Sequence, residues 1–282
     1  MKRFIPLEDN HTKVVVASDQ HLGYANSDKT SFNAFLDALG QDSDITHFVL
    51  LGDVVDMWRR DASGVFVENR DTFDKIFALR DRGIDVRYVA GNHDYHVLSL
   101  QDHSYPFDFQ PELPLPDTAN NVTYRFVHGY QFDLEQQEAW MEGLCRVMSD
   151  QVGDFESGLW AELTRGWSNP KYVLFEIFQS WKKTGMRTMS DRLQQRPEVR
   201  FSGLNQYLLD EINKRACASV GRDEVLVFGH THVPFVNKSE NVANCGSWVK
   251  DATPYDTYVE LTGGKPHLFV FPRREITERK EC

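Results

Sequence analysis

The feature that most constrains this chain is a repeated order along its sequence: a short apolar run, then glycine or a polar residue, then a helical stretch. Strand-like runs rich in β-branched and aromatic residues occupy residues 13–18, 47–51, 86–90, 124–127 and 225–228. Between the first three runs, residues 30–39 and 71–82 carry apolar side chains at helical spacing, and a glycine follows each stretch. Strands that alternate with helices in this way predict an α/β fold.

The C-terminal part of the chain has a different pattern. Residues 233–236, 257–261 and 267–271 are strand-like, and turn signals such as Gly263-Gly264 separate them. These runs predict a second sheet that is partly antiparallel. The proline-rich run at residues 111–116 is predicted to be an extended surface loop.

Residues 134–220 show no strand-like alternation and are predicted to be helical throughout. We therefore divide the chain into a core, residues 1–133 and 221–282, and a helical insertion, or cap, within the same domain. Residues 161–200 contain eight basic and four acidic side chains, with several aromatic side chains beside them. A basic, aromatic helical element suits an anionic amphiphile or a membrane surface. Aromatic side chains at helical spacing also suit simple packing of the insertion onto the core, and the sequence leaves both interpretations open.

The charge balance and the apolar stretches bear on partners and location. A net charge of −11, from 31 basic and 42 acidic residues, argues against a protein that coats nucleic acid through general electrostatic attraction. The first nine residues lack the apolar core of a signal peptide, and the longest apolar stretches, such as residues 172–178, are too short to span a bilayer. The sequence thus predicts a cytoplasmic protein in which any membrane contact is peripheral and made by the insertion. The oligomeric state stays open.

Each core run is followed at once by side chains that can bind a metal ion. These residues are Asp19, His21, Asp53, Asn92, His93, Asp94, His128, His230 and His232. The loops at the carboxyl ends of strands in α/β sheets converge and form ligand sites. Asp19 and His21 are two positions apart, as are His230 and His232, so an extended backbone would point both members of a pair to the same side. Each motif alone could be a chance turn, but five in order, each after an apolar run, favour one shared site.

The donor set indicates which metals fit this site. Histidine nitrogens, carboxylate oxygens and an amide oxygen, without a thiolate, suit Mn²⁺, Fe or Zn²⁺ rather than calcium or an iron–sulfur cluster. We expect Mn²⁺, with Fe or Zn²⁺ as alternatives. The donors are too many for one tetrahedral ion, so the sequence predicts two divalent ions about 3.5–4 Å apart with a carboxylate between them.

Asp-x-His, Gly-Asp, Gly-Asn-His-Asp, a single His and Gly-His-x-His, in this order, resemble the motifs of the calcineurin-like metallophosphoesterase superfamily. The resemblance covers about residues 13–130 and 221–271 and implies a four-layer αββα sandwich of two mixed β-sheets with a helical insertion. It implies that one ion is held by Asp19, His21, Asp53 and His232, and the other by Asp53, Asn92, His128 and His230. It also implies that His93 lies over the phosphate of a phosphate-ester substrate, with Asp94 orienting the imidazole.

A narrower resemblance concerns the substrate. Residues 52–58 (Gly-Asp-Val-Val-Asp-Met-Trp), the insertion after His128-Gly129 and residues 244–248 (Asn-Cys-Gly-Ser-Trp) look similar to UDP-2,3-diacylglucosamine hydrolases. In that branch the insertion caps the site and holds acyl chains, and the enzyme cleaves a pyrophosphate bond. That branch typically has arginine where this chain has His93. The resemblance implies hydrolysis of a phosphodiester or pyrophosphate bond in a nucleotide-linked or lipid-linked substrate.

Two alternative functions would use the same fold. Residues 18–24 (Ser-Asp-Gln-His-Leu-Gly-Tyr) are also similar to the opening motif of double-strand-break repair nucleases, which implies a Mn²⁺-dependent nuclease. The net charge speaks against it, because a DNA enzyme is expected to show a broad basic track. Other members of the superfamily lose metal ligands and act as non-catalytic scaffolds, whereas this chain keeps each expected ligand.

Overall fold

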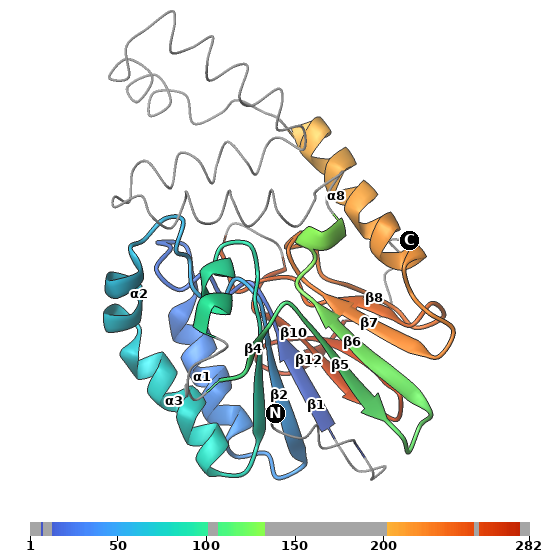
Figure 1. Ribbon diagram of the computed structural model, residues 1–282, viewed down its shortest axis with the longest axis horizontal. Coiled ribbons are helices and arrows are strands. Elements are labelled where there is room, and N and C mark those ends of the chain that lie inside the picture. Colours follow the sequence, from blue (N-terminus) through green and yellow to red (C-terminus); the bar gives the residue numbers. More distant parts are fainter. Residues whose placement is uncertain (1–6, 8–12, 101–106, 133–201, 251–253, 277–282) are drawn as a thin grey trace, which may run out of the picture.

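The computed structural model describes residues 7, 13–100, 107–132, 202–250 and 254–276. Two mixed β-sheets form the centre of the molecule, and helices cover their outer faces (Figure 1). The greater part of the predicted insertion, residues 134–201, lies outside the described residues, and so does its basic, aromatic stretch. The predicted α/β class with two mixed sheets is confirmed.

The strands fall into two sheets. The seven-stranded sheet has the order β12 (Arg274–Glu275), β11 (Lys265–Val270), β10 (Thr257–Thr262), β1 (Lys13–Ala17), β2 (Ile45–Leu51), β3 (Asp85–Val89) and β4 (Phe109–Gln110). The five-stranded sheet has the order β5 (Glu112–Asp117), β6 (Val122–Val127), β7 (Glu224–Phe228), β9 (Val242–Asn244) and β8 (Phe235–Asn237). Parallel pairing joins β1 through β4 in the first sheet and β6, β7 and β9 in the second. The loops that leave parallel strands therefore gather at one edge of each sheet.

Alternate residues of the central strands point into two different apolar layers. Val14 and Val16 of β1 belong to the core between the sheets, together with Val49, Phe126 and other residues of both sheets. The next residues along β1, such as Val15, point to the opposite face and pack under helices. The two-residue period of a strand thus fills both layers at once, which is why the central runs are apolar throughout.

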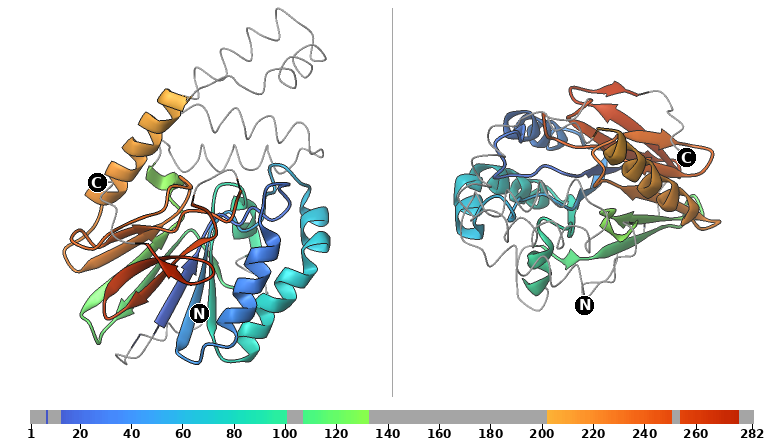
Figure 2. Two further views of the ribbon diagram at one scale, coloured as in Figure 1. Left: turned by 180° about the vertical axis from the view of Figure 1, so that it is seen from behind. Right: turned by 90° about the horizontal axis from the view of Figure 1, so that it is seen from above.

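Helices pack on the outer face of each sheet. On the seven-stranded sheet lie α1 (Lys29–Leu39), α2 (Ala62–Glu68) and α3 (Arg70–Asp81), which pack through side chains such as Phe35 and Ile76. Two 3₁₀ turns, η1 (Tyr95–Leu100) and η2 (Tyr130–Phe132), follow β3 and β6. On the five-stranded sheet lies α8 (Ser202–Ala218), whose Ile212 and Ala216 pack against the outer face (Figure 2). The order helix, sheet, sheet, helix is the predicted four-layer sandwich.

Local signals account for the helix ends. The carboxylate of Asp28 accepts a hydrogen bond from the N–H of Ser31 (3.1 Å) at the start of α1, and Asp61 caps α2 in the same way through Gly64. Gly83 follows α3 with φ +92°, a conformation that glycine adopts without steric cost. The ends of α1 and α3 lie within one residue of those predicted for the two helices, whereas α2 was not predicted.

The proline-rich run is a strand and not the predicted loop. β5 pairs antiparallel with β6 over its whole length, and Leu113 and Leu115 point into the core between the sheets while Pro114 and Pro116 are exposed. Proline lacks the N–H that a central strand would need, so it is tolerated at a sheet edge, which is the position of β5. The composition of the run suggested a loop, but its two-residue apolar alternation decided the structure.

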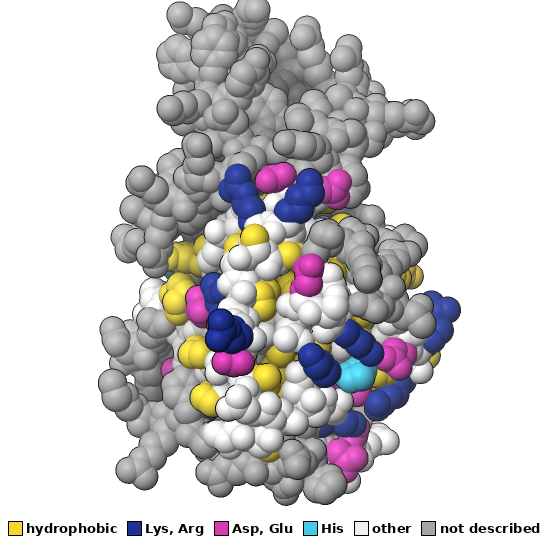
Figure 3. Space-filling model, turned by 90° about the vertical axis from the view of Figure 1, so that its right-hand side faces the viewer, with side chains coloured by type: hydrophobic (Ala, Val, Ile, Leu, Met, Phe, Trp, Pro, Cys, Tyr) yellow, Lys and Arg dark blue, Asp and Glu magenta, His cyan; other side chains and the backbone are white. Residues whose placement is uncertain are grey.

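No helix among the described residues is long and apolar enough to cross a membrane. Figure 3 shows one side of the molecule, where Lys and Arg side chains are interspersed with Asp and Glu side chains. Among the described residues, Lys238 and His267 both contact Glu275, at 3.6 and 3.3 Å.

Candidate metal centre

The loops that follow the neighbouring strands β1 and β2 stay paired beyond the ends of the strands. The N–H of Asp19 donates to the carbonyl oxygen of Gly52 (3.0 Å), and the N–H of His21 donates to that of Asp53 (2.8 Å). This backbone pairing places three predicted site residues, Asp19, His21 and Asp53, side by side. The pairing is an extension of the parallel ladder, so the sheet itself aligns the two loops.

Five predicted site residues have a left-handed backbone. Their φ angles are 58° for Asp19, 46° for His21, 52° for Asp53, 67° for His230 and 57° for His232. They make up five of the eight non-glycine residues with positive φ in the part of the chain that the structure describes. Such conformations are sparsely populated and cluster at functional sites. The extended backbone expected for the two pairs is therefore wrong, because sharp left-handed turns aim these side chains.

Glycines let the loops approach closely. A Cβ atom on Gly52 would overlap the imidazole of His128, and one on Gly229 would overlap the side chains of Ser18 and Asp19. Gly52 also has φ +80°. Crowding between the loops thus requires glycine at both positions, and the left-handed turn requires it at Gly52 as well.

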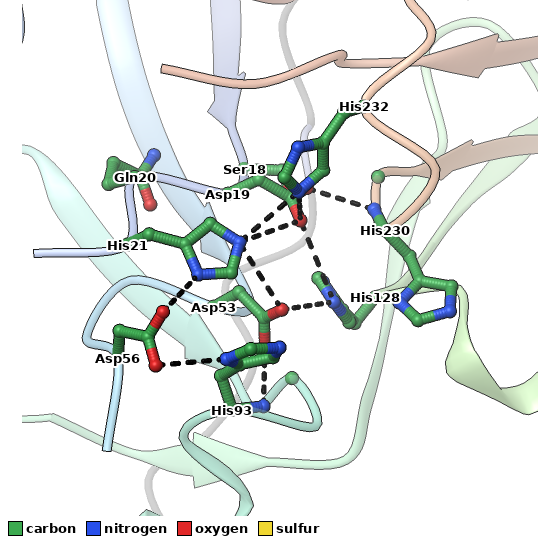
Figure 4. Close-up of polar contacts among 12 residues, drawn as sticks. Ser18, Asp19, Gln20, His21, Asp53, Asp56, His93, His128, His230 and His232 are labelled. Atoms are coloured by element: carbon green, nitrogen blue, oxygen red, sulfur yellow. Dashed lines mark hydrogen bonds and ion pairs between the residues drawn. The ribbon is translucent and has the colours of Figure 1, made fainter. Parts of the chain in front are cut away.

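The structure brings the predicted donors from both sheets into one place (Figure 4). The donors form three groups, and within each group the ligand atoms all lie within 4.8 Å of one another. The groups are Asp19, His21 and His232; His21, Asp53 and His93; and Asp53, His128 and His230, so that His21 and Asp53 each belong to two of them. His230 and His232 belong to different groups although they are neighbours in sequence. The short distances within the groups include 3.2 Å from His232 Nε2 to Asp19 Oδ1 and 3.2 Å from His128 Nε2 to Asp53 Oδ2. Asn92 is buried in the loop after β3, next to His93.

The donor atoms fit a divalent cation. Asp19 Oδ2 accepts hydrogen bonds from Ser18 Oγ (2.6 Å) and from the N–H of His230 (2.9 Å), while Asp19 Oδ1 is buried without a hydrogen-bond partner. Likewise, Nδ1–H of His128 donates to the carbonyl oxygen of Leu51 (2.9 Å), and its buried Nε2 has no hydrogen-bond partner. Buried polar atoms are normally satisfied. A cation bound at each of these atoms would satisfy them, and the outer hydrogen bonds would hold each ligand in place.

Asp56 is a site residue that the sequence analysis missed. Its carboxylate accepts hydrogen bonds from Nδ1 of His21 (3.0 Å) and Nδ1 of His93 (3.0 Å), and its side chain is fully buried. It therefore fixes the orientation of two imidazoles and leaves their Nε2 atoms for other partners. The signal was available: Asp56 stands three residues after Asp53 in an otherwise apolar segment.

Asp94 does not contact the imidazole of His93 in the way that the resemblance implied. Its two carboxylate oxygens accept hydrogen bonds from the N–H of Gly91 (2.6 Å), the N–H of Val54 (2.8 Å) and the hydroxyl of Tyr88 (2.7 Å). Asp94 is fully buried and ties the loop after β3 to the loop after β2. Burial and the charge of Asp53 raise its pKa to about 6. The carboxylate beside the His93 ring belongs to Asp56.

His93 lies between two rings. It stacks on Trp58 at 4.2 Å between ring centroids, and it meets His21 edge-on at 4.7 Å. The backbone N–H of His93 donates to Asp53 Oδ1 (2.8 Å). Burial lowers the pKa of His93, although Asp56 and Asp53 oppose this. The imidazole is therefore held at the edge of the donor cluster in one orientation.

The site concentrates opposite charges in a buried place. Burial lowers the pKa of His21, but the neighbouring carboxylates of Asp19 and Asp56 outweigh burial and raise it to about 9. Burial opposes the charged form of His128 as well, yet the charges of Asp53 and Asp19 raise its pKa to about 10. For Asp19 and Asp53 the pKa is lowered, because the nearby histidines outweigh burial. In the metal-free protein the histidines thus carry the positive charge that a cation would supply.

Metal binding should therefore release protons at neutral pH. His21 and His128 have pKa values of about 9 and 10 without metal, so both are protonated at pH 7 and must lose a proton to coordinate. The affinity for the metal should therefore weaken as pH falls. Below pH 9, the logarithm of the binding constant should decrease by up to about two for each unit by which the pH is lowered. Calorimetric titration with Mn²⁺ in buffers of different ionisation enthalpy counts the protons. A binding enthalpy that is the same in each buffer would contradict this prediction.

Comparison with known proteins places this geometry in a family. No curated protein matches the chain. Similar solved structures include a cold-active protein-tyrosine phosphatase of a psychrophile, Shewanella sp. (16% identity, TM-score 0.41, covering 97% of this chain and 83% of that one), and a dimetal phosphatase from Danio rerio (12% identity, TM-score 0.43, 93% and 100%). The profile of the calcineurin-like phosphoesterase family matches residues 12–234, which include all of the predicted site residues. The chain therefore belongs to the calcineurin-like phosphoesterase family.

Proposed function

We propose that this protein is a dinuclear metal-dependent phosphoesterase that hydrolyses a phosphodiester or pyrophosphate bond. The observation that carries the proposal is the pair of donor groups, Asp19/His21/His232 and Asp53/His128/His230, that meet from four loops of two sheets. Membership of the phosphoesterase family supports the same reaction class. The two groups are close enough for one carboxylate, that of Asp53, to serve both.

The groups supply six of the seven proposed ligands, and the family resemblance supplies the seventh, Asn92. One ion would be held by Asp19, His21, Asp53 and His232, and the other by Asp53, Asn92, His128 and His230. Mn²⁺ is the ion we propose, because oxygen and imidazole donors without a thiolate suit it, and Fe or Zn²⁺ would fit the same set. When bound, two divalent ions lower the pKa of water and neutralise charge on the phosphoryl oxygens.

The protein's own residues would orient the substrate and move a proton. His93, whose Nδ1 is held by Asp56, would present Nε2 to the phosphoryl group. In its protonated form it would stabilise negative charge there and donate a proton to the leaving oxygen. The stack on Trp58 prevents the imidazole from turning away.

Replacing His93 with Gln should reduce turnover most for substrates with poor leaving groups. A general acid contributes about 10²–10⁴-fold where the leaving oxygen needs a proton, and little where it does not. We therefore expect a loss in this range with an alkyl phosphodiester and a much smaller loss with a p-nitrophenyl ester, measured as kcat with Mn²⁺. Equal losses for both esters would exclude the role of proton donor.

The substrate class is tested by a turnover panel with Mn²⁺ present. It compares UDP-diacylglucosamine, soluble nucleotide-sugars, cyclic nucleotides, phosphomonoesters, and single- and double-stranded DNA. We propose a nucleotide-linked or lipid-linked substrate, and preferential turnover of one of the first two would support it. Turnover of DNA alone would show that the nuclease alternative is correct. Absence of turnover in a metal-loaded sample would favour the scaffold alternative.

A further inference from the structure

Asp56 receives more hydrogen-bond donors than its role as a partner of histidine requires. Its Oδ1 accepts from Nδ1 of His93 (3.0 Å) and from the N–H groups of Trp58 (3.2 Å) and Arg59 (3.0 Å). Its Oδ2 accepts from Nδ1 of His21 (3.0 Å) and from the guanidinium of Arg59. Each oxygen of one carboxylate thus faces a different imidazole, and Arg59 contacts both oxygens.

Arg59 is buried and joins two loops of the site. Its side chain is 8% exposed, and its guanidinium carbon lies 4.3 Å from the ring centroid of Tyr24. Tyr24 belongs to the loop after β1, three residues beyond His21, whereas Arg59 and Asp56 belong to the loop after β2. A planar guanidinium that stacks on one loop and donates to a carboxylate of the other holds the two in a fixed relation.

The arrangement has a chemical consequence for the histidines. A guanidinium keeps its charge at any physiological pH and has only donors, so it continuously engages Oδ2 of Asp56. The backbone N–H groups of residues 58 and 59 engage Oδ1 in the same way. The carboxylate therefore cannot rotate, and both imidazoles find an acceptor opposite Nδ1. In its neutral form, each imidazole therefore carries its proton on Nδ1 and leaves Nε2 available.

We propose that Arg59 is a positioning residue of the catalytic site: by clamping Asp56, it orients His21 toward a metal ion and His93 toward the substrate. This rests on the proposed function for those two histidines. Arg60, the next residue, gives a matched control, because its guanidinium pairs with Glu68 and Asp61 near the surface. A purely structural role, in which Arg59 only ties loops together, would change stability but leave the imidazoles as they are.

The test compares Arg59→Met, Arg59→Lys and Arg60→Met in the full chain. We expect Arg59→Met to lower kcat with Mn²⁺ and a p-nitrophenyl phosphodiester about 10–100-fold, the range typical of residues that hold a metal ligand, with KM changed less than about threefold. Arg59→Lys should recover part of the loss, since a lysine keeps the charge but not the planar stack. Arg60→Met should stay within about twofold of the wild type.

The second readout does not depend on turnover. Long-range ¹H–¹⁵N spectra of the histidine side chains, for the metal-free protein and the Zn²⁺-loaded protein, report the tautomer of His93. We expect the Nδ1–H form in the wild type and Arg60→Met, and a mixture of tautomers in Arg59→Met. Unchanged spectra and an unchanged kcat in a folded Arg59→Met protein would overturn the proposal. If the wild type has no phosphoesterase activity, the proposed function fails, and the spectra alone decide the role of Arg59.

Discussion

Replacing Asp53 with Asn should abolish Mn²⁺-dependent phosphoester turnover, with kcat reduced about 10³-fold or more. The carboxylate of Asp53 belongs to the donor group with His128 and His230, and its Oδ2 also lies 3.6 Å from Nε2 of His21 in the other group, so its loss would remove the ligand that we propose for both ions. Metal ions supply several kcal/mol of stabilisation to a phosphoryl transition state, and each 1.4 kcal/mol corresponds to about tenfold in rate. Asparagine keeps the size of the side chain, so the change tests the charge. Metal content by mass spectrometry and kcat with a chromogenic phosphodiester measure the effect.

The control is Asp37→Asn, which makes the same chemical change on the exposed face of α1. Asp37 pairs with Lys75 on the surface, and such pairs contribute about 1 kcal/mol or less. This variant should keep the metal content and turnover of the wild type. Activity like that of the wild type in a metal-replete Asp53→Ala protein would refute the assignment of two ions around Asp53.

Replacing Gly91 with Ala should also remove activity, although Gly91 has no side chain to contribute. A Cβ atom at this position would overlap both the carboxylate and the backbone nitrogen of Asp53, and the backbone cannot move aside cheaply. Overpacking of this kind typically costs about 1–3 kcal/mol of stability. Because the displaced group is Asp53, we expect kcat to fall at least about 10²-fold as well, since a misplacement of about 1 Å can cost that much. Chemical denaturation and steady-state kinetics measure the two effects.

Gly83→Ala separates crowding from backbone strain. Gly83 has φ +92°, so alanine is strained there by about 1 kcal/mol, but no atom lies within 4 Å of the added Cβ. This variant should lose stability without losing kcat. If Gly91→Ala kept the kcat of the wild type while losing stability, the close packing of its loop would not be what holds Asp53 in position.

The sequence predicted the strand runs well because each depends on a local two-residue or continuous apolar pattern. The runs at residues 86–90 and 124–127 correspond to β3 and β6, with ends shifted by one or two residues. The strands β4 and β12 have two residues each, too few to show a period, and they form only because a neighbouring strand supplies hydrogen bonds. The proline-rich run at residues 111–116 has the composition of a loop but forms a strand, because its place at a sheet edge is not a local property.

In the candidate site, too, some features follow from local sequence patterns and others depend on tertiary packing. The order of apolar run and donor residue along the chain was enough to select the donors that the structure brings together, such as Asp19, Asp53 and His128, because loops after parallel strands converge. The left-handed turns at those residues and the partner of His93 were not visible in this order. Asp56 and His93 are 37 positions apart, and the contact depends on how two loops pack against each other.

What the sequence determined by itself is therefore the class of fold and the set of donors, since hydrophobic period, turn residues and side-chain chemistry act over a few positions. The tertiary structure alone decided which donors share a group, which carboxylate holds which imidazole, and that a buried arginine clamps that carboxylate. These depend on distances between loops from different strands, and such distances are set by the packing of two sheets through a common apolar core.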